Sequence, residues 1–430
     1  MMFSRPSSWF VLGLLLAFGL PSSLPVLADP SPADTSRVRV RLNHRSSIET
    51  VKLTVDEGPL AVHLPSGGAP VMRLQSGETT TLGLRQSDVY IRRGADGLYA
   101  TELQLRPAGS DAAWTLSFEN AERTYTGGLY LAPDAGSGLL VVNDVPIEDY
   151  VASVVASEYG LDDTEGKKAM AVVARTYGLF ASAKFGGAYD HADGTASQVY
   201  NGLDAVTKAS RQAAQATAGE VLTHDGTLIQ AVYFSSSGGH TANNEDVWNA
   251  KEPIPYLRGK KDPYDTVSPH HTWSASVDRS PLLQVLTRKR GSLVNGFVID
   301  DRSPDGRVKT IKLLHSDGPN HRMNANTFRL VVNQGVDGAP LKSTWFDARR
   351  SGDTYVFDGH GFGHGVGLSQ WGAHGMAEQG QSYRNILHFY YTDVDIQRLN
   401  RVQKDPVDAP VAKDPRPAPS DSTTTRRIGW

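Results

Sequence analysis

Polar and apolar residues alternate along residues 37–42 and 49–55, as they do in strands with one buried face. Residues 89–91 and 139–142 have the composition of further short strands. Turn signals such as Ser66-Gly67-Gly68 and Asp96-Gly97 separate these segments. We therefore predict a β-rich region, from about residue 37 to residue 145, that packs with a later mixed α/β core in an α+β fold.

A helical pattern follows between residues 144 and 160, with an apolar stripe of Ile147, Val151, Val154 and Val155. Glu158 continues this stripe, because it lies three residues after Val155 and four after Val154. Burial of a carboxyl group raises its pKa, which suits a general acid that works near neutral pH. The spacing leaves an alternative open, in which the helix frays after Val155 and Glu158 is solvated.

The next helix is predicted over residues 162–184, where Asp162 and Glu165 have the spacing of a capping box and Lys184 lies in the last turn. Arg175 and Tyr177 are polar-tipped residues in this otherwise apolar, alanine-rich helix. Each therefore needs a partner, a carboxylate for the guanidinium and a hydrogen bond for the phenol. For Arg175 taken alone, the pattern favours an ordinary structural ion pair.

The first residues have the pattern of a secretory signal. Arg5 precedes an apolar run over residues 9–20, and Val26-Leu27-Ala28 is a small-residue cleavage pattern before Asp29. The run is shorter than the roughly 20 apolar residues that span a bilayer, and no later segment is apolar enough to do so. We expect a cleaved signal peptide over residues 1–28 and an exported protein that is periplasmic or extracellular and associated with the cell wall.

Composition narrows the expected partners. The 430 residues include 39% hydrophobic residues, which is enough for two or three core-bearing units, and the net charge of −3 gives no general attraction to nucleic acid. Because the chain has no cysteine, it forms no disulfide. Residues 402–430 are rich in proline, serine and threonine with few large apolar side chains, so we predict a disordered tail.

A glycine-rich stretch near the end, residues 359–376, reads GHGFGHGVGLSQWGAHGM. His360 and His364 have the spacing of two zinc ligands on one helix face, but glycine at every second position from Gly359 to Gly367 disfavours a helix. An extended segment is favoured, pressed against the core where another backbone or a flat polymer approaches closely. We expect His360 and His374 to be structural or exposed.

Residues 235–240 read SSSGGH and follow a predicted hairpin over residues 221–234, in which Asp225-Gly226 is a type I′ turn signal. A serine hydrolase with His240 as its base is disfavoured because the pattern G-x-S-x-G is absent. A polar loop that hydrogen-bonds sugar hydroxyls fits the serines and glycines better. Tyr200, Trp248 and Tyr256 are aromatic residues of the kind that stack on sugar rings, although each such residue more often lies in a core or at its rim.

Several blocks together resemble the SpoIID/LytB family of bacterial sporulation and cell-wall proteins. They are VPIEDYV at 145–151 leading to Ser157-Glu158, EGKKAMAVVARTY at 165–177, SQVYNG at 197–202, YFSSSGGHT at 233–241 with Glu245 and Trp248, and GHGVGLSQWGA at 363–373. Their order and rough spacing match across about residues 37–395. The resemblance implies a SpoIID-like catalytic core over residues 146–395.

The resemblance also implies a peptidoglycan lytic transglycosylase, in which Glu158 is the catalytic acid and then the base that leaves a 1,6-anhydro end. The alternative is a non-catalytic wall-binding module that enhances a partner amidase. Peptidoglycan glycan strands are the expected partner, with a cell-wall amidase as a candidate second one. The substrate-binding residues expected from the matching blocks are Arg175, Tyr177, Gln198, Tyr200, Ser236, Ser237, Gly238, His240, His364 and Gln370.

The chain departs from the family in two places. Zinc-containing members have cysteine and histidine before the SQVYNG block, whereas here His191 and Asp193 stand without a cysteine, so we expect neither zinc nor any other cofactor. The residues after Glu158, Tyr159-Gly160, replace a Met-Pro pair that many members have. That replacement would change the setting of the carboxyl group.

Overall fold

The computed structural model describes residues 37–399, apart from 44–46, 95, 110–111, 120, 135–137, 181–184, 186, 249–251, 317 and 339–340. The predicted signal peptide, the predicted tail and Lys184 lie outside the described residues. Within them, strands and helices combine in an α+β fold, as the sequence predicts. No helix of this described part is long and apolar enough to cross a membrane.

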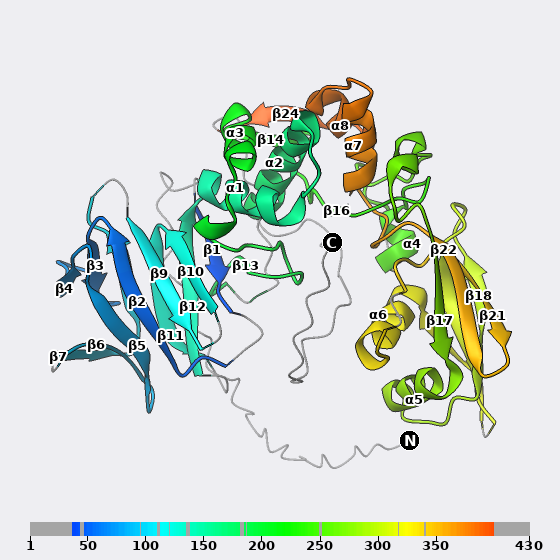
Figure 1. Cartoon of the computed structure of the whole chain (residues 1–430), viewed down its shortest axis with the longest axis horizontal. Coiled ribbons are helices and arrows are strands. Elements are labelled where there is room, and N and C mark those ends of the chain that lie inside the picture. The colour runs from blue at the N-terminus through cyan, green and yellow to red at the C-terminus, as the bar shows by residue number, and fades with distance from the viewer. Residues whose placement is uncertain are drawn as a thin grey trace, which may run out of the picture.

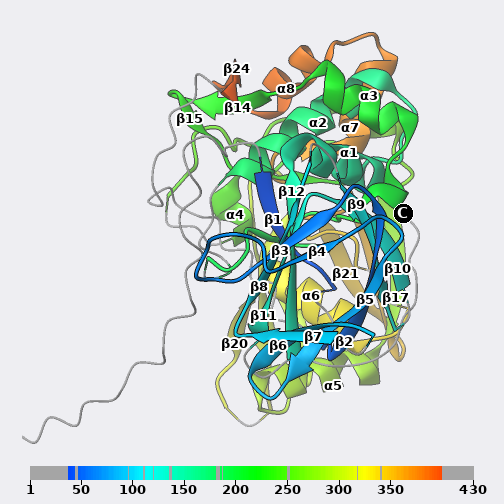
Figure 2. The ribbon, with the colours of Figure 1, turned by 90° about the vertical axis from the view of Figure 1, so that its left-hand side faces the viewer.

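The N-terminal part is a sandwich of two sheets, which lies nearest to the viewer in Figure 2. The seven-stranded sheet runs in the order β13, β1, β12, β11, β8, β3, β4, with bounds His191–Ala192, Arg37–Arg41, Gly138–Pro146, Gly128–Asp134, Leu103–Pro107, Leu60–His63 and Met72–Leu74. The six-stranded sheet runs β10, β9, β2, β5, β6, β7, with bounds Ala121–Thr126, Ala113–Phe118, Thr50–Glu57, Thr79–Arg85, Asp88–Arg93 and Asp96–Ala100. All pairs are antiparallel except β1 with β13, which is parallel.

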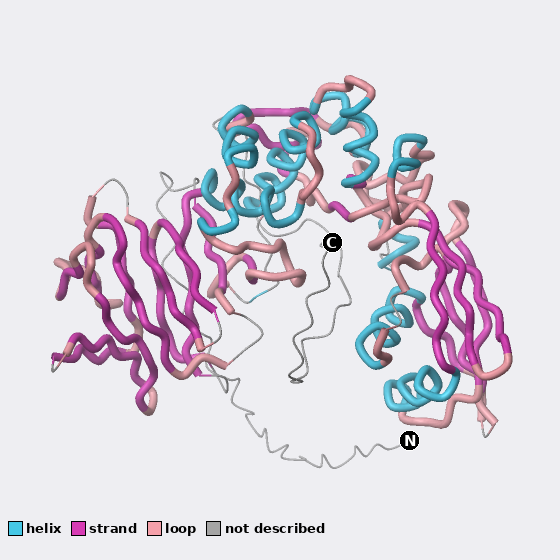
Figure 3. The backbone as a smooth tube through the Cα atoms, in the orientation of Figure 1, coloured by secondary structure: helices cyan, strands magenta, loops and turns pink. Residues whose placement is uncertain are grey.

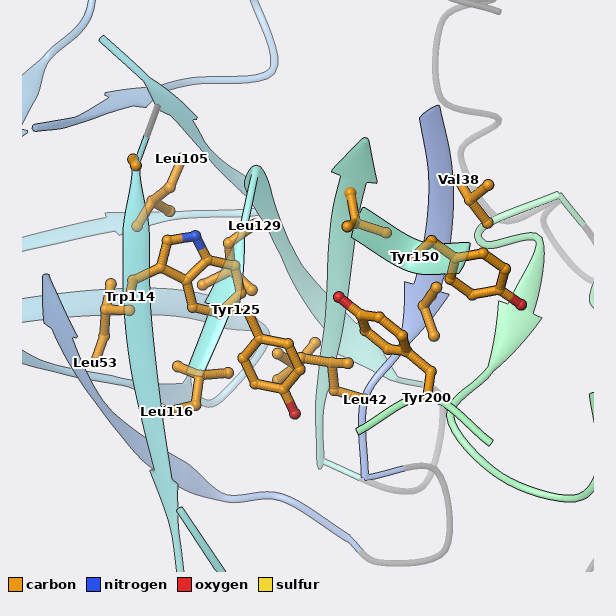
Figure 4. Packing of buried hydrophobic residues seen from close by; sticks show 14 of the residues in the cluster. Val38, Leu42, Leu53, Leu105, Trp114, Leu116, Tyr125, Leu129, Tyr150 and Tyr200 are labelled. Atoms are coloured by element: carbon orange, nitrogen blue, oxygen red, sulfur yellow. The ribbon is translucent and has the colours of Figure 1, made fainter. Parts of the chain in front are cut away.

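The two sheets bury their apolar faces against each other. The alternation in the sequence correctly predicts β1 and β2, and the strand-like composition correctly predicts β6 and β12. Trp114 and Tyr125 pack in this core with ring centroids 5.1 Å apart, and the Trp114 indole N–H donates to the carbonyl of Gly127 at 2.8 Å (Figure 4). The turn expected at Asp96-Gly97 is wrong, because β7 already begins at Asp96. Gly94, with a φ of +60°, lies in the turn before it.

The helical part follows the sandwich along the chain and lies beside it (Figure 1). Its helices are α1 (Ile147–Glu158), α2 (Thr164–Leu179), α3 (Lys208–Ala216), α4 (Asn244–Trp248), α7 (Gln370–Glu378) and α8 (Tyr383–Tyr390), with the short 3-10 helices η2 (Leu203–Ala205) and η3 (Pro263–Val267). Its strands are β14 (Glu220–His224), β15 (Thr227–Leu228), β24 (Asp395–Arg398), β16 (Tyr233–Phe234) and β23 (Leu368–Ser369). A second hydrophobic core joins α2, α7 and α8 to β14 and β23.

In the helical part, the predicted turn at Asp225-Gly226 is confirmed, whereas the N-terminal cap of α2 lies one residue from its predicted position. Asp225 and Gly226 have φ angles of +50° and +79°, as the predicted type I′ turn requires. The cap of α2 is Asp163, whose carboxylate accepts a hydrogen bond from the N–H of Gly166 at 2.5 Å, so the capping box predicted at Asp162 is wrong by one residue. The side chain of Asp162 points into solvent.

Residues 272–360 form a lobe at the opposite end of the molecule from the sandwich, with the helical part between them (Figures 1 and 3). It comprises β17 (Thr272–Asp278), α5 (Arg279–Arg290), β18 (Gly296–Arg302), β19 (Val308–Leu314), β20 (His321–Asn324), α6 (Ala325–Gly335), β21 (Phe346–Ser351) and β22 (Thr354–His360). Phe297, Phe328 and Phe357 lie in a hydrophobic core that belongs to this lobe. This separate core lies within residues 146–395, the range over which the family resemblance implies a catalytic core.

Candidate active site

The carboxyl group of Glu158 lies where three segments of the helical part meet. Glu158 is the last residue of α1, so the helix does not fray after Val155. Its side chain is half-buried, and Oε1 accepts a hydrogen bond from the backbone N–H of Val199 at 2.7 Å. The backbone carbonyl of Glu158 accepts from Nε2 of Gln370, the first residue of α7, at 2.9 Å. Gln370 therefore holds the end of α1 through the backbone.

The residue after Glu158 anchors the chain as it leaves α1. Tyr159 is buried, and its hydroxyl donates to Oδ2 of Asp163 at 2.8 Å. The same oxygen lies 2.7 Å from Nδ1 of His374 in α7, so His374 has a structural partner, as expected. Tyr159 thus fixes the turn between α1 and α2.

A glutamine and two tyrosines lie beside Glu158. Gln198 is fully buried; its Oε1 accepts from the hydroxyl of Tyr150 at 2.8 Å, and its Nε2 donates to the hydroxyl oxygen of Tyr233 at 3.2 Å. Burial raises the pKa of Tyr233 well above its usual value, and the negative charge of Glu158 raises it further. Burial and nearby charges, Glu158 among them, raise the pKa of Tyr150 in the same way. Both hydroxyls therefore stay protonated at neutral pH.

Tyr177 belongs to the same neighbourhood, whereas Arg175 and Tyr200 lie in the interior. The Tyr177 ring is 5.5 Å from that of His191. The fully buried guanidinium of Arg175 makes a two-pronged ion pair with Glu148, at 3.0 and 2.6 Å, and donates to backbone carbonyls of α3 and β14. The buried hydroxyl of Tyr200 donates to Oδ1 of Asn143 at 2.8 Å. These contacts favour structural roles for Arg175 and Tyr200.

The SSSGGH loop surrounds the buried carboxylate of Asp265, a residue that is not among those expected from the sequence. It accepts hydrogen bonds from Oγ of Ser236 at 2.8 Å, N–H of Ser237 at 2.8 Å, N–H of Gly238 at 2.9 Å and Oγ of Ser369 at 3.0 Å. Since these serines and the glycine are tied to Asp265, the loop is held to η3 and to the start of α7. The Ser236 hydroxyl and the Ser237 backbone N–H thus both donate to a carboxylate of the protein itself.

A second buried carboxylate, that of Asp262, lies nearby and is likewise not among the residues expected from the sequence. Its Oδ2 accepts from the hydroxyl of Tyr390 at 2.9 Å. Burial raises the pKa of Asp262 to about 6, and the negative charge of Asp265 adds to the effect. Both aspartates come from the polar segment KKDPYD, whose composition is typical of an exposed loop, so the pattern gives no signal of their burial.

The glycine-rich stretch is not extended throughout, contrary to the prediction, because Gly361, Gly363, Gly365 and Gly367, which follow the end of β22, have φ angles between +72° and +107°, and α7 begins at Gln370. Its glycines lie against other parts of the same molecule. A Cβ on Gly367 would lie 2.1 Å from the carbonyl oxygen of Val232, and one on Gly363 would lie 2.8 Å from Cβ of Phe234. β23, which lies within the stretch, pairs in parallel with β16. The approach of the Val232 backbone therefore accounts for Gly367, and the approach of the Phe234 side chain accounts for Gly363.

His364 lies on the other face of β16 from Gln198. Its ring centroid is 5.5 Å from that of Phe234 and 5.2 Å from that of Trp248. Tyr233 contacts Gln198, and since successive side chains of a strand point to opposite faces, Tyr233 and Phe234 face different neighbours. His240 is half-buried, and its Nδ1 lies 2.7 Å from the carbonyl oxygen of Thr241.

Comparison of the sequence with known proteins identifies the family of the chain. A family model described as "SpoIID: Stage II sporulation protein" matches residues 135–224. An uncharacterized protein of Brachyspira hyodysenteriae is 33% identical over 291 residues, which cover 65% of this chain and 74% of that protein. The stage II sporulation protein D of Bacillus amyloliquefaciens is 31% identical over 278 residues, which cover 60% of this chain and 76% of that protein. The chain belongs to the SpoIID/LytB family.

A further relative is the amidase enhancer of Bacillus subtilis, which is 32% identical over 269 residues, 53% of this chain and 37% of that protein. The segment that the SpoIID model matches contains α1, α2, α3, β13 and β14. It therefore includes Glu158, Gln198 and Val199, but not β16, α7 or the lobe of residues 272–360.

His191 and Asp193 lie before Gln198, where the family resemblance would place zinc ligands. Nε2 of His191 lies 2.9 Å from the carbonyl oxygen of Gly178, and the carboxylate of Asp193 accepts from the N–H of Asn43 at 2.6 Å. Among the described residues, no three histidine, aspartate or glutamate side chains are grouped so that they could hold a metal. The absence of zinc from this protein stays a prediction.

Proposed function

We propose that this protein is a peptidoglycan lytic transglycosylase in which Glu158 acts first as general acid and then as general base. The single observation that carries the proposal is the setting of its carboxyl group: half-buried at the end of α1, with Oε1 held by the Val199 N–H at 2.7 Å. Because Oε1 is used as an acceptor, the proton of the acid form is best carried by Oε2. A carboxyl group whose orientation is fixed in this way is suited to the role of a general acid.

The reaction needs only this one protein carboxyl group. The acid form protonates the glycosidic oxygen while the C1–O bond breaks through an oxocarbenium-like transition state. The carboxylate that results takes the proton of the sugar's own 6-hydroxyl, whose oxygen bonds to C1. The products are a 1,6-anhydro sugar and a strand with a free hydroxyl, and the regenerated acid is ready for another cycle. No water is consumed.

Family membership supports a role in the bacterial cell wall. The relatives named as stage II sporulation protein D and as an amidase enhancer make glycan strands the substrate class that we propose, with export to the periplasm or the cell surface. The second relative also favours an alternative, in which the protein binds strands and enhances an amidase without cleaving them. The half-buried, oriented carboxyl group of Glu158 favours cleavage.

The test is mass spectrometry of purified glycan strands after digestion with the mature protein, with the same strands incubated without protein as control. We expect fragments with 1,6-anhydro ends. Fragments with reducing ends would show hydrolysis instead. An absence of fragments, together with co-sedimentation of protein and strands, would favour the binding module and reject the transglycosylase.

A further inference from the structure

Gln198 belongs to the block that resembles the family's substrate-binding motifs, yet its side chain has no exposed surface. Both ends of its amide are used inside the protein, one by the hydroxyl of Tyr150 and the other by that of Tyr233. Tyr150 is also fully buried. A sugar therefore has no access to this amide, and the role of Gln198 must be exerted through its neighbours.

Two neighbours of Gln198, Val199 and Tyr233, connect it to Glu158. Val199, the next residue, donates its backbone N–H to Oε1 of Glu158. Tyr233 receives the amide hydrogen of Gln198 on its hydroxyl oxygen, so its own hydroxyl hydrogen remains to be donated elsewhere. Tyr233 also packs against both hydrophobic cores, that of the sandwich and that of the helical part. The amide of Gln198 thus sets the position of two groups around one carboxyl group.

The segment that carries Gln198 is anchored on both sides. At its start, Asp190 accepts hydrogen bonds from the side chain and the backbone N–H of Arg39 at 2.8 and 2.9 Å, and β13 then pairs in parallel with β1. At its end, the backbone N–H and side-chain amide of Asn201 donate to the hydroxyls of Ser153 and Ser157 in α1, at 3.3 and 3.1 Å. The sandwich and α1 therefore hold the segment between them.

We propose that Gln198 is a positioning residue, which through Tyr150, Tyr233 and the Val199 N–H fixes the orientation of the Glu158 carboxyl group, and does not bind the substrate itself. The inference rests on the proposed function of Glu158. A misplacement of about 1 Å at a reacting group reduces turnover by as much as about 100-fold. Loss of the amide should therefore lower kcat and leave KM unchanged.

The test uses the mature protein with three substitutions. Gln198→Leu removes both hydrogen bonds, and we expect kcat for strand cleavage to fall about 10-fold to 100-fold with KM unchanged. Tyr150→Phe removes only the hydroxyl that supports Gln198, and we expect a smaller fall in the same direction. Tyr391→Phe is the matched control, because Tyr391 is equally buried and its hydroxyl donates to the carbonyl of Val232, also at 2.8 Å. We expect it to lower Tm like Tyr150→Phe but to keep kcat.

A readout that does not need catalysis separates this inference from the proposed function. The backbone amide resonance of Val199 in ¹⁵N–¹H spectra reports its hydrogen bond to Glu158. We expect Tyr150→Phe to move this resonance and Tyr391→Phe to leave it in place. A wild type that releases no fragments would reject the proposed function, and the resonance would still decide on positioning. The inference is overturned by an unmoved resonance in Tyr150→Phe, by equal kcat in the two tyrosine variants, or by a Gln198→Leu variant that changes KM alone.

Discussion

The side-chain amide of Gln370 donates to the backbone carbonyl of Glu158 at 2.9 Å, although 212 positions separate the two residues in the chain. The last carbonyls of a helix have no partner within it, so the first residue of α7 satisfies one of those at the end of α1. This contact joins the SpoIID segment to the glycine-rich stretch. It also fixes the backbone from which the Glu158 side chain extends.

We predict that Gln370→Leu lowers the free energy of unfolding by about 1–3 kcal/mol, because a part-buried carbonyl loses its donor. Urea unfolding measures the change. The matched control is Gln284→Leu in α5, where an exposed glutamine amide donates to Oγ of Ser280. Such a surface change should stay within about 0.5 kcal/mol of the wild type. Equal effects of the two substitutions would show that the Gln370 contact adds nothing to stability.

The glycine-rich stretch gives a second prediction from two glycines with nearly the same backbone conformation. Gly367 and Gly380 have φ angles of +80° and +77°, but a Cβ on Gly367 would lie 2.1 Å from the Val232 carbonyl oxygen, whereas one on Gly380 meets nothing within 4 Å. Gly380→Ala should cost about 1–2 kcal/mol from backbone strain alone. Gly367→Ala should cost about 1–3 kcal/mol more, from the clash.

Thermal unfolding of the two alanine variants beside the wild type checks this difference. If Gly367→Ala is no less stable than Gly380→Ala, the close approach of the stretch to β16 is wrong.

The third prediction concerns the dependence of stability on pH. The pKa of Asp262 is about 6 in the folded protein, against an ordinary 3.8, so the folded state binds this proton more tightly than the unfolded chain. The stabilisation is therefore complete below about pH 3.8 and is lost as the pH rises through about 6. Relative to Asp262→Asn, we expect the wild type to lose up to about 3 kcal/mol between about pH 4 and about pH 7.

Urea unfolding of wild type and Asp262→Asn across this pH range measures the loss, with Asp162→Asn, a change at an exposed carboxylate, as control. The control should follow the wild type. Should Asp262→Asn also follow it, the carboxyl group of Asp262 would not take up its proton on folding.

Local patterns predict the parts of this fold that short-range physics decides. Alternation identifies β1 and β2 because one face of each is buried, and the turn at Asp225-Gly226 is identified because both residues adopt positive φ. The apolar stripe of α1 predicts that the helix extends to Glu158, because one face of this helix is buried as well. The cap of α2 is misplaced by one residue because Asp162 and Asp163 are both good capping residues, and only the buried Tyr159, bonded to Asp163, distinguishes them.

Contacts between distant segments are what the sequence does not reveal. The partners of Gln198 lie at positions 150 and 233, so its local sequence does not distinguish a buried residue from a sugar ligand, the role that the family resemblance implies. Asp265 is buried because serine hydroxyls and backbone N–H groups from two other segments converge on it. In the lobe of residues 272–360, the packing of Phe297, Phe328 and Phe357 is what shows that its core is separate.

The central claim is that the Glu158 carboxyl group transfers the proton that cleaves the glycan strand. Glu158→Gln keeps the shape of the side chain and an oxygen that can accept the Val199 N–H, but it cannot deliver or recover a proton. We predict that release of soluble fragments falls about 10²-fold to 10⁴-fold, while Tm and co-sedimentation with peptidoglycan stay at the wild-type values. A folded, strand-binding Glu158→Gln variant that releases fragments at the wild-type rate would contradict the account.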